Sequence, residues 1–360
     1  MIERELPDPT ATAATSEAGI GPVLRRWAPP LLKFLIAGGL LYYVLTTRVT
    51  AGAAESLNNV FVRSPAIFIT AILAYSIQLF IGAQRVRVLL APLGVKIPYW
   101  TMLRLTYLGG FFDTFMVTSV GGDAVKAIYL ARETPKGHKL EAVSVLVLDR
   151  LMGLLGLLTL MVVMTLWRVD ELYAHEQIRP YVKWLFIVPL LLLLGTAGLL
   201  SETVRTSPPI RIVLKYMPFG SHFERAYASL QGFRDRPVIL LQTWVMSLVV
   251  HTCGVISGYV LVFGMGQTAN FGPFLVAWFI ANFIVSFAPA QGVGVGQFFF
   301  EPIFRNIAGL ENGWVLATAV QATAILAKAP GAIAWLMSRA RAPRLTPGGP
   351  GASVKAPYDV

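Results

Sequence analysis

Apolar residues are grouped along this chain into eight long segments separated by short polar stretches. A helix of about 20 apolar residues is long enough to cross the hydrocarbon core of a bilayer. The segments cover about residues 28–47, 65–90, 99–120, 141–167, 182–201, 238–264, 271–300 and 313–338. This pattern predicts an all-α polytopic membrane protein.

The positions of Lys and Arg predict how the first four segments are threaded, because short cytoplasmic loops are enriched in these residues. Residues 48–64 are poor in charge and are expected outside. Basic residues precede the first segment and follow both the second and the third: Arg25 and Arg26, then Arg85, Arg87 and Lys96, then Lys126, Arg132, Lys136 and Lys139. Two successive cytoplasmic loops cannot flank one full crossing. Residues 99–120 are therefore expected to form a re-entrant hairpin from the cytoplasmic side.

The same reasoning applies to the second half of the chain. The 168–181 loop is acidic and expected outside, whereas the 202–236 loop is basic and expected inside. The C-terminus carries Arg339, Arg341 and Arg344 and is expected inside, so residues 271–300 are predicted to be re-entrant from the outside. The prediction is about six full transmembrane helices plus two re-entrant hairpins; the alternative is eight full spans.

Residues 28–167 and 182–338 would then have the same order of elements and opposite orientation, as in an inverted repeat. Such repeats, with broken helices in matching positions, occur in many transporters. Five positions match at a constant offset of 172: Tyr107, Phe111, Thr114, Phe115 and Gly122 with Phe279, Phe283, Ser286, Phe287 and Gly294. Chance similarity between membrane segments is the alternative.

The ends of the chain are polar. Residues 1–27 are rich in Ala, Thr and Pro and predict a disordered cytoplasmic tail, and residues 339–360 predict a disordered basic tail. The 202–236 loop mixes basic and aromatic residues. It is expected to be either an amphipathic segment on the inner leaflet or a plain connector.

Composition supports a membrane protein. Hydrophobic residues make up 55% of the chain, charged residues 14%, and the mean hydropathy is +0.63, whereas soluble domains contain roughly a quarter charged residues. No charged residue occurs in the 64 residues from Pro237 to Phe300. The net charge of +11 is therefore assigned to cytoplasmic loops rather than to a nucleic-acid surface. With the single Cys253 and four scattered His, no disulfide, metal site or cofactor is expected.

One candidate site is a break in the third segment, at Gly121, Gly122 and Asp123, followed by Lys126. Paired glycines in an apolar segment interrupt a helix, and the freed backbone groups must be buried in protein or line a cavity. Asp123 would either cap the next helix or help to form an anion site with Lys126, because helix N-termini attract phosphate.

A second break lies in residues 288–297, where Pro289, Gly292, Gly294 and Gln297 occur close together. A proline and several glycines at this spacing are incompatible with a regular membrane helix. The segment is either a structural turn or part of a transport path.

The charged residues that fall within apolar segments include Asp149, Arg150 and Lys328. Adjacent residues point in different directions on a helix, so Asp149 and Arg150 are not expected to pair only with each other. Charges inside a membrane usually face a cavity or a partner. The alternatives are an interfacial position for Asp149 and Arg150, and snorkelling for Lys328. Arg85 and Arg87 are interpreted as cytoplasmic anchors or as headgroup contacts.

These motifs resemble the lysylphosphatidylglycerol synthetase transmembrane-region family, which is also described as flippase-like. The resemblance covers about residues 30–340. It rests on Gly121-Gly122-Asp123 with Lys126, on Asp149-Arg150 before Gly153, and on Pro289 through Gln297. Gln297 stands where the family typically has a glutamate, and Glu301 is the nearest acid. No counterpart of the soluble aminoacyltransferase domain occurs in the sequence.

The resemblance implies a lipid translocase for an anionic phospholipid or a polyprenyl-linked or glycolipid substrate, located in the plasma (inner) membrane with both termini cytoplasmic. Membrane lipids would be its partners, and nucleic acid would not. A membrane-embedded transferase using Asp113, Asp123 and Asp149 is one alternative. A scaffold for a partner enzyme in lipid or envelope glycoconjugate synthesis is another.

Overall fold

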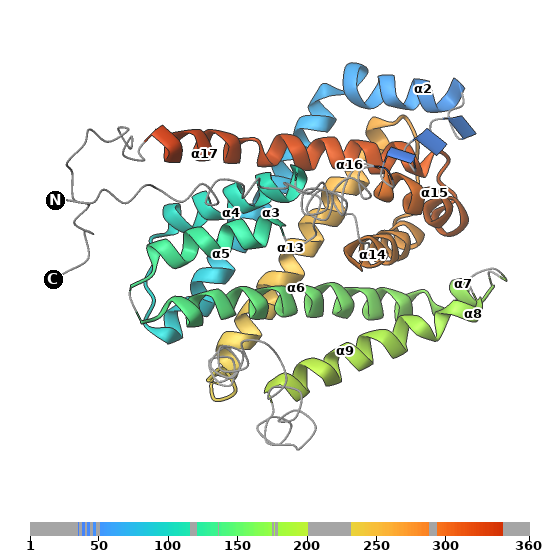
Figure 1. Ribbon diagram of the computed structural model, residues 1–360. Helices are drawn as coiled ribbons and strands as arrows, with labels where there is room; N and C mark the ends of the chain where they lie inside the picture. The colour runs from blue at the N-terminus through green and yellow to red at the C-terminus, as the bar shows by residue number, and fades with distance from the viewer. Residues whose placement is uncertain are drawn as a thin grey trace, which may run out of the picture.

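The computed structural model describes residues 51–115, 121–135, 137–174, 176, 179–200, 232–287 and 294–340, with a few positions between 35 and 47. Within these residues the regular structure is entirely helical (Figure 1). The N-terminal part contains α2 (Ala51–Asn58), the π-helix η1 (Asn59–Arg63), α3 (Pro65–Leu90), the 3-10 turn η2 (Ala91–Leu93), α4 (Tyr99–Phe115), α5 (Gly121–Glu133) and α6 (Lys139–Trp167). It is followed by α7 (Val169–Ala174), α8 (Arg179–Val182), α9 (Trp184–Leu200), α13 (Pro237–Gly264), α14 (Phe271–Phe287), α15 (Val295–Ala308), α16 (Gly313–Lys328) and α17 (Pro330–Ala340).

Within the described residues, four helical stretches are long and apolar enough to cross a membrane. They are Pro65–Leu93, Lys139–Trp167, Pro237–Gly264 and Gly313–Leu336. Trp184–Gly195 and Phe271–Ser286 are shorter apolar helices. The all-α membrane fold is therefore confirmed, while the number of crossings and the inverted repeat stay predictions.

Both segments that were expected to be broken contribute to pairs of packed helices. α4 packs against α5, and α14 packs against α15. The connections, residues 116–120 and 288–293, lie outside the described residues. The first pair extends further than the sequence pattern suggests, because residues 121–133 form α5 rather than a loop. Gly122, Lys126 and Leu130 recur every four residues and bury one face of this helix.

Glycines permit the closest approaches between helices. A Cβ atom on Gly122 would collide with the backbone oxygen of Gly109 and lie 2.5 Å from the Cβ of Asp113. On α6, a Cβ on Gly156 would lie 2.6 Å from the Cβ of Ser247 on α13. These contacts bring α5 onto α4 and α13 onto α6, and the polar side chains nearby are brought together as a result.

The buried apolar residues of the described chain form two large clusters and a small third one of Leu172, Val182 and Val276. One contains residues of α13 to α16 with the second half of α6. The other contains the end of α3, α4, α5 and the first half of α6. On α3, Ala71 belongs to the first cluster and Ala83 to the second. Between them, Tyr75, Gln78 and Gly82 of α3 line the candidate site described below.

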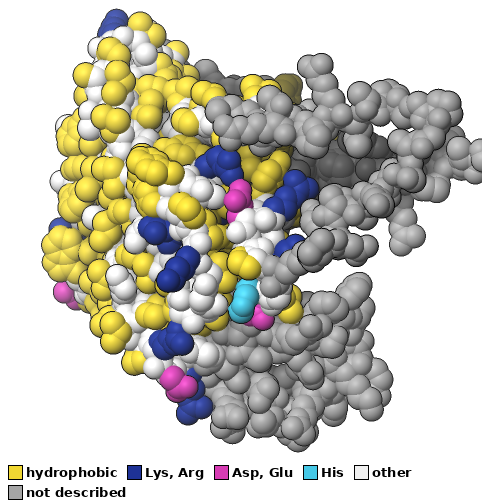
Figure 2. Space-filling view, turned by 90° about the vertical axis from the view of Figure 1, so that its left-hand side faces the viewer, with side chains coloured by type: hydrophobic (Ala, Val, Ile, Leu, Met, Phe, Trp, Pro, Cys, Tyr) yellow, Lys and Arg dark blue, Asp and Glu magenta, His cyan; other side chains and the backbone are white. Residues whose placement is uncertain are grey.

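The surface is largely apolar with a basic region at one end. Leu190, Leu191 and Leu194 on α9 are each more than half exposed, as expected for side chains in contact with lipid. Figure 2 shows Lys and Arg side chains among apolar ones on the side where the α3–α4 and α5–α6 connections lie in Figure 1. Exposed basic residues of these connections and the adjoining helices are Lys96, Arg104, Arg132 and Lys139.

Most residues of the two predicted tails and of the 202–236 loop lie outside the part of the chain that the structure describes. Residues 1–27 and 341–360, and residues 202–231 of the basic loop, lie outside the described residues. Residues 339 and 340, placed in the C-terminal tail by the sequence pattern, are the last residues of α17.

Candidate functional site: a charged cavity between the helices

A cavity of about 220 Å³ lies among α3, α4, α5, α6, α13 and the end of α16. Four basic and three acidic residues line it, which is a high density of charge for the inside of an apolar helix assembly. They are Arg85, Lys126, Arg150 and Lys328, and Asp113, Asp123 and Asp149. Tyr75, Gln78, Leu79, Gly82, Thr106, Gly109, Gly110, Gly122 and Val250 complete the lining.

The most buried ion pair of the cavity joins α3 to α6. The Nε of Arg85 donates to the Oδ1 of Asp149 at 2.7 Å, and the two side chains are 10% and 11% exposed. A second guanidinium nitrogen of Arg85 donates to the Oγ of Ser247 on α13 at 2.8 Å. The arginine therefore ties three long helices together, and its charge is already neutralised by Asp149.

The second ion pair joins α5 to α6. The Nε of Arg150 donates to the Oδ2 of Asp123 at 2.5 Å. The Arg150 side chain is 58% exposed and that of Asp123 is 27% exposed. Adjacent residues of α6 thus point to different partners, as expected from helix geometry. The Asp123 side chain meets Arg150 from the first turn of α5.

Lys126 and Lys328 are the remaining cations. Among the described residues, neither has a carboxylate oxygen within 4.0 Å of its ammonium group. Lys126 is buried with 8% exposure. The Nζ of Lys328 lies 6.0 Å from the centre of the Tyr75 ring. A lysine in this position is costly unless a ligand or water solvates its charge.

Paired glycines on α4 make room for these two lysines. A Cβ on Gly109 would lie 3.1 Å from the Cβ of Lys126, and one on Gly110 would lie 3.3 Å from the Cδ of Lys328. The aliphatic part of each lysine therefore packs on a bare stretch of α4 backbone. Lysines from α5 and α16 can consequently reach one cavity.

Asp113 and Gln78 leave polar atoms without a partner. The Oδ1 of Asp113 and the Nε2 of Gln78 are buried, and neither has a hydrogen-bond partner among the described residues. Buried polar atoms are normally hydrogen-bonded. One acceptor and one donor of the cavity are thus available to a ligand.

The cavity is deep along α6. Asp149 is ten residues after Lys139, where α6 begins, which corresponds to about 15 Å along the helix axis. The hydrocarbon core is about 30 Å thick. Asp149 and Arg150 thus lie about half a hydrocarbon thickness along α6 from its first residue.

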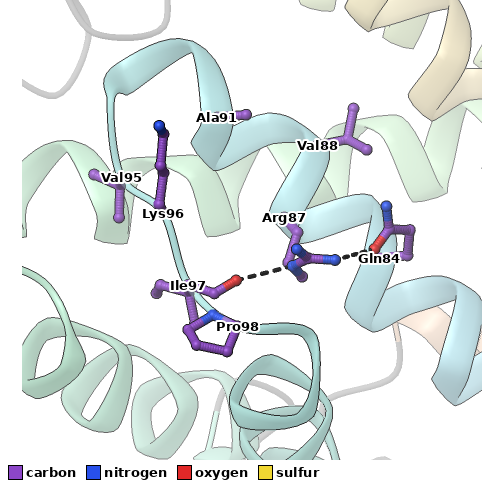
Figure 3. Close-up of a pocket in the computed structure, with 8 residues that line it drawn as sticks. All are labelled: Gln84, Arg87, Val88, Ala91, Val95, Lys96, Ile97 and Pro98. Carbon is purple, nitrogen blue, oxygen red and sulfur yellow. Dashed lines mark hydrogen bonds between the residues drawn. The ribbon is translucent and has the colours of Figure 1, made fainter.

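Two other cavities lie nearby. One of about 640 Å³ shares Arg85, Asp123, Arg150 and Val250 with the charged cavity, and apolar residues form most of its remaining lining. The other, of about 420 Å³, lies at the end of α3 (Figure 3). There Arg87 donates to the carbonyl oxygen of Ile97 at 2.9 Å and to the Oε1 of Gln84 at 2.6 Å. Arg87 therefore holds the α3–α4 turn.

The structure brings together most of the site residues expected from the sequence. Gly122, Asp123, Lys126, Asp149, Arg150 and Lys328 line one cavity, and Gly121 is buried beside them at the start of α5. Pro289 and Gly292 lie outside the described residues. Within the described part of the chain, no three His, Cys, Asp or Glu residues are placed to hold a metal ion.

Gly294 and Gln297 lie at the start of α15 and are not among the cavity residues. The backbone N–H of Gly294 donates to the Oε1 of Gln297 at 2.7 Å, so Gln297 satisfies the backbone of its own helix end. Glu301, the nearest acid, accepts from the backbone N–H of Trp314 at 3.1 Å and pairs with Arg305 at 2.6 Å. Its carboxylate thus holds α15 to the start of α16.

Sequence reasoning underestimated α3. Tyr75, Gln78, Gly82 and Arg85 all line the cavity. Their spacing of three, four and three residues places them on one face of a helix. This stripe of polar residues and glycine in an otherwise apolar segment could have been recognised from the sequence. Arg85 belongs to the stripe and faces the cavity, whereas Arg87 does not.

Comparison with known families agrees with this architecture. Residues 31–331 match the family described as the lysylphosphatidylglycerol synthase TM region, which is more than four fifths of the chain. No curated protein matches the chain. By the extent of this match, the chain belongs to the lysylphosphatidylglycerol synthase transmembrane-region family, integral membrane proteins associated with membrane lipid metabolism.

Proposed function

We propose that this protein translocates a lipid across the inner membrane, with the lipid headgroup bound in the charged cavity and its tails in the surrounding hydrocarbon. The observation that carries the proposal is that Lys126 and Lys328 lie in one small cavity among apolar helices and have no carboxylate partner among the described residues.

The chemistry of the cavity favours a phosphate-containing headgroup. Lys ammonium groups bind phosphate as point charges, and the two lysines approach the cavity from different helices. The free Oδ1 of Asp113 can accept a hydrogen bond from a hydroxyl or ammonium group of the same headgroup. An anionic phospholipid with a hydroxylated headgroup, or a lipid-linked sugar phosphate, has both features.

The arrangement of helices supports alternating exposure of the site. Lys328 is the only described cavity residue that comes from α16, whereas the other charged residues come from α3 to α6. A movement of α16 and α17 relative to α4 would therefore add Lys328 to the cavity or remove it. The basic connections at one end would face the cytoplasm, together with both termini.

A transferase mechanism is less well supported by these contacts. Asp123 and Asp149 are each held in an ion pair with an arginine, so neither carboxylate is free to act as a general base. Asp113 alone lacks a second acid–base group of the kind that such a reaction requires.

The test is translocation of fluorescent lipids by purified protein in proteoliposomes, read as the loss of fluorescence when dithionite is added outside. The probes are headgroup-intact phosphatidylglycerol and a glycolipid with a labelled acyl chain. We expect Lys126→Gln and Lys328→Gln each to slow translocation about 10-fold or more, because one charged hydrogen bond is worth roughly 1.5–3 kcal/mol.

Lys139→Gln is the matched control, because this lysine is exposed at the start of α6 and does not line the cavity. It should translocate lipid like the wild type. The proposal is wrong if wild-type protein moves neither probe, or if both cavity lysine variants move lipid at the wild-type rate.

A further inference from the structure

We propose that the Asp123–Arg150 ion pair is a lateral gate between the charged cavity and the lipid, and that the 640 Å³ groove outside it binds an acyl chain of the substrate. This inference rests on the proposed lipid-translocating function. It adds the route by which a headgroup reaches the cavity and the place that one tail occupies.

The two cavities meet at the ion pair. Arg85, Asp123, Arg150 and Val250 line both of them. Beyond these shared residues, the charged cavity continues to Lys126, Lys328 and Asp113, whereas the groove has a mainly apolar lining. Its other residues are Ala124 and Ala127 of α5, Val143, Leu146, Val147, Gly153, Leu154 and Leu157 of α6, His251 of α13 and Ser286 of α14.

This change of lining matches the chemistry of a single lipid molecule. A phosphate headgroup needs cations and hydrogen-bond partners, and an acyl chain needs an apolar channel. The groove volume of about 640 Å³ is within the range of small-molecule sites. Because the groove adjoins the charged cavity at the Asp123–Arg150 pair, one molecule can place its headgroup in the cavity and its chain in the groove once the pair has opened.

Differences in burial identify which of the two ion pairs can open. The Arg85–Asp149 pair is about nine tenths buried and receives support from Ser247, so it is a fixed part of the wall. The Arg150 side chain is 58% exposed, and within the part of the chain that the structure describes its guanidinium donates a hydrogen bond to Asp123 alone. Arg150 is therefore less confined by packing than Arg85, and it is the arginine that can rotate away from its partner.

A phosphate at the entrance would exchange partners with this pair. Its oxygens would bind the Arg150 guanidinium, which suits phosphate geometry. Asp123 would then rely on Lys126, which is three residues further along α5 and on a neighbouring position of the helix. When the gate opens, the Asp123 carboxylate thus still has the Lys126 ammonium group nearby on the same helix.

The first experiment exchanges the charges of the gate. Asp123→Asn and Arg150→Gln each remove one partner, and the double variant Asp123→Arg with Arg150→Asp restores a pair of opposite orientation. In the proteoliposome assay we expect each single variant to change the translocation rate at least 5-fold and the double variant to return within about 2-fold of the wild type.

Arg104 and Glu133 provide the matched control. They form a 2.7 Å ion pair between α4 and α5 and are 41% and 39% exposed, but they do not line either cavity. The swap Arg104→Glu with Glu133→Arg, and its single variants, should all behave like the wild type. The gate is ruled out if the Asp123 and Arg150 variants are equally neutral, or if the exchanged pair is as impaired as the single variants.

The second experiment tests the groove without requiring transport. Phosphatidylglycerol with a diazirine on one acyl chain is activated by light in proteoliposomes, and labelled peptides are identified by mass spectrometry. We expect labelling to concentrate on the α5, α6 and α13 residues of the groove. Val147→Trp should reduce that labelling about 10-fold by filling the groove, because Val147 lines it and is 54% exposed.

Val163→Trp is the control on the same helix, since Val163 is 48% exposed and lies outside the groove. It should leave labelling of the groove unchanged. Even labelling over all lipid-facing helices, unaffected by Val147→Trp, would overturn the acyl site. A labelled groove in a wild-type protein that moves no lipid would instead contradict the proposed function while retaining the binding site.

Discussion

Asp149 and Arg150 are neighbours in the chain, yet their side chains have different surroundings. Asp149 is enclosed with Arg85 and Ser247, whereas Arg150 reaches outward to Asp123 at the border of the groove. Removing one partner of a buried pair leaves an uncompensated charge, which costs about 3–5 kcal/mol. The Asp123–Arg150 pair is enclosed less tightly, with 27% of the Asp123 and 58% of the Arg150 side chain exposed. Because of this difference in burial, we assign a structural role to the Arg85–Asp149 pair and expect the Asp123–Arg150 pair to be the one that moves.

This difference can be measured as protein stability. We expect Asp149→Ala to lower the midpoint of thermal unfolding in detergent by about 5–10 °C, because it leaves Arg85 buried without its counter-ion. Glu133→Ala, which breaks the exposed pair with Arg104, should shift the midpoint by less than about 2 °C. Equal shifts for the two variants would show that the Arg85–Asp149 pair is not specially buried.

Sequence alone identified the residue types of the site better than their contacts. Asp149, Arg150, Lys126 and Lys328 were recognisable as charges in or beside apolar segments. The partner of Asp149 was not, because Arg85 is 64 residues away in the chain and looks like a cytoplasmic anchor at the end of its helix. Pairing over such a distance depends on how α3, α6 and α13 pack, and no local pattern encodes it.

At the scale of elements, the α4–α5 pair determines where the lysines lie. Gly109 and Gly110 on α4 provide a surface without side chains, and the buried face of α5 presents Lys126 to it. The Arg104–Glu133 ion pair links the outer ends of the two helices. We therefore treat α4 and α5 as one unit. Gly121, Gly122 and Asp123 lie at the start of α5, at the opposite end of this helix from Glu133.

The orientation of this unit in the membrane can be tested by labelling. In a Cys253→Ser background, cysteines at Lys96 and His138 should react with a membrane-impermeant maleimide from the same side, because both residues are exposed at the connections flanking α4 and α5. A cysteine at the exposed Tyr173, beyond the far end of α6, should react from the opposite side.

The comparison is made in sealed vesicles of both orientations. Reaction of positions 96 and 138 from opposite sides would mean that α4 and α5 together cross the membrane, which would contradict the re-entrant prediction for this region.

α4 ends at Phe115 and α14 at Phe287, close to the breaks that clustered Gly and Pro predicted, but Gly121 and Gly122 themselves lie in the first turn of α5. The length of the first helix pair was not predicted. Residues 121–133 contain several charges and have the composition of a loop, yet their period of four in Gly122, Lys126 and Leu130 buries one face. Charge counts alone place such a segment in water, and only its packing against α4 explains its helical structure.

At the scale of the whole molecule, the cavity is formed by two distant parts of the chain. The N-terminal helices supply all its charged residues except Lys328, and α17 continues from α16 across α4. Gly331 lies directly against the backbone of Tyr107, and the rings of Phe112 and Trp335 are 5.9 Å apart. This contact between α4 and α17 is where the two parts would move during translocation.

Fixing this contact should stop the movement. With Cys253 replaced by Ser, cysteines at Phe112 and Trp335 joined by a short thiol cross-linker should slow lipid translocation about 10-fold or more, and a cleavable cross-linker should restore the rate after reduction. Cross-linked cysteines at Arg104 and Glu133 join two helices of one unit and should have little effect. Full activity of the 112–335 cross-linked protein would exclude movement at this contact.

The charges of the cavity also have an electrostatic consequence. Four basic and three acidic side chains line the cavity, so the sum of their formal charges is +1. A headgroup with a single negative charge would make the occupied cavity neutral, and one with two would leave it negative. Uncompensated charge is costly in a low-dielectric interior. The complex with a headgroup of one negative charge is neutral and therefore has the lowest electrostatic cost. Charge balance would then discriminate between lipids independently of their shape.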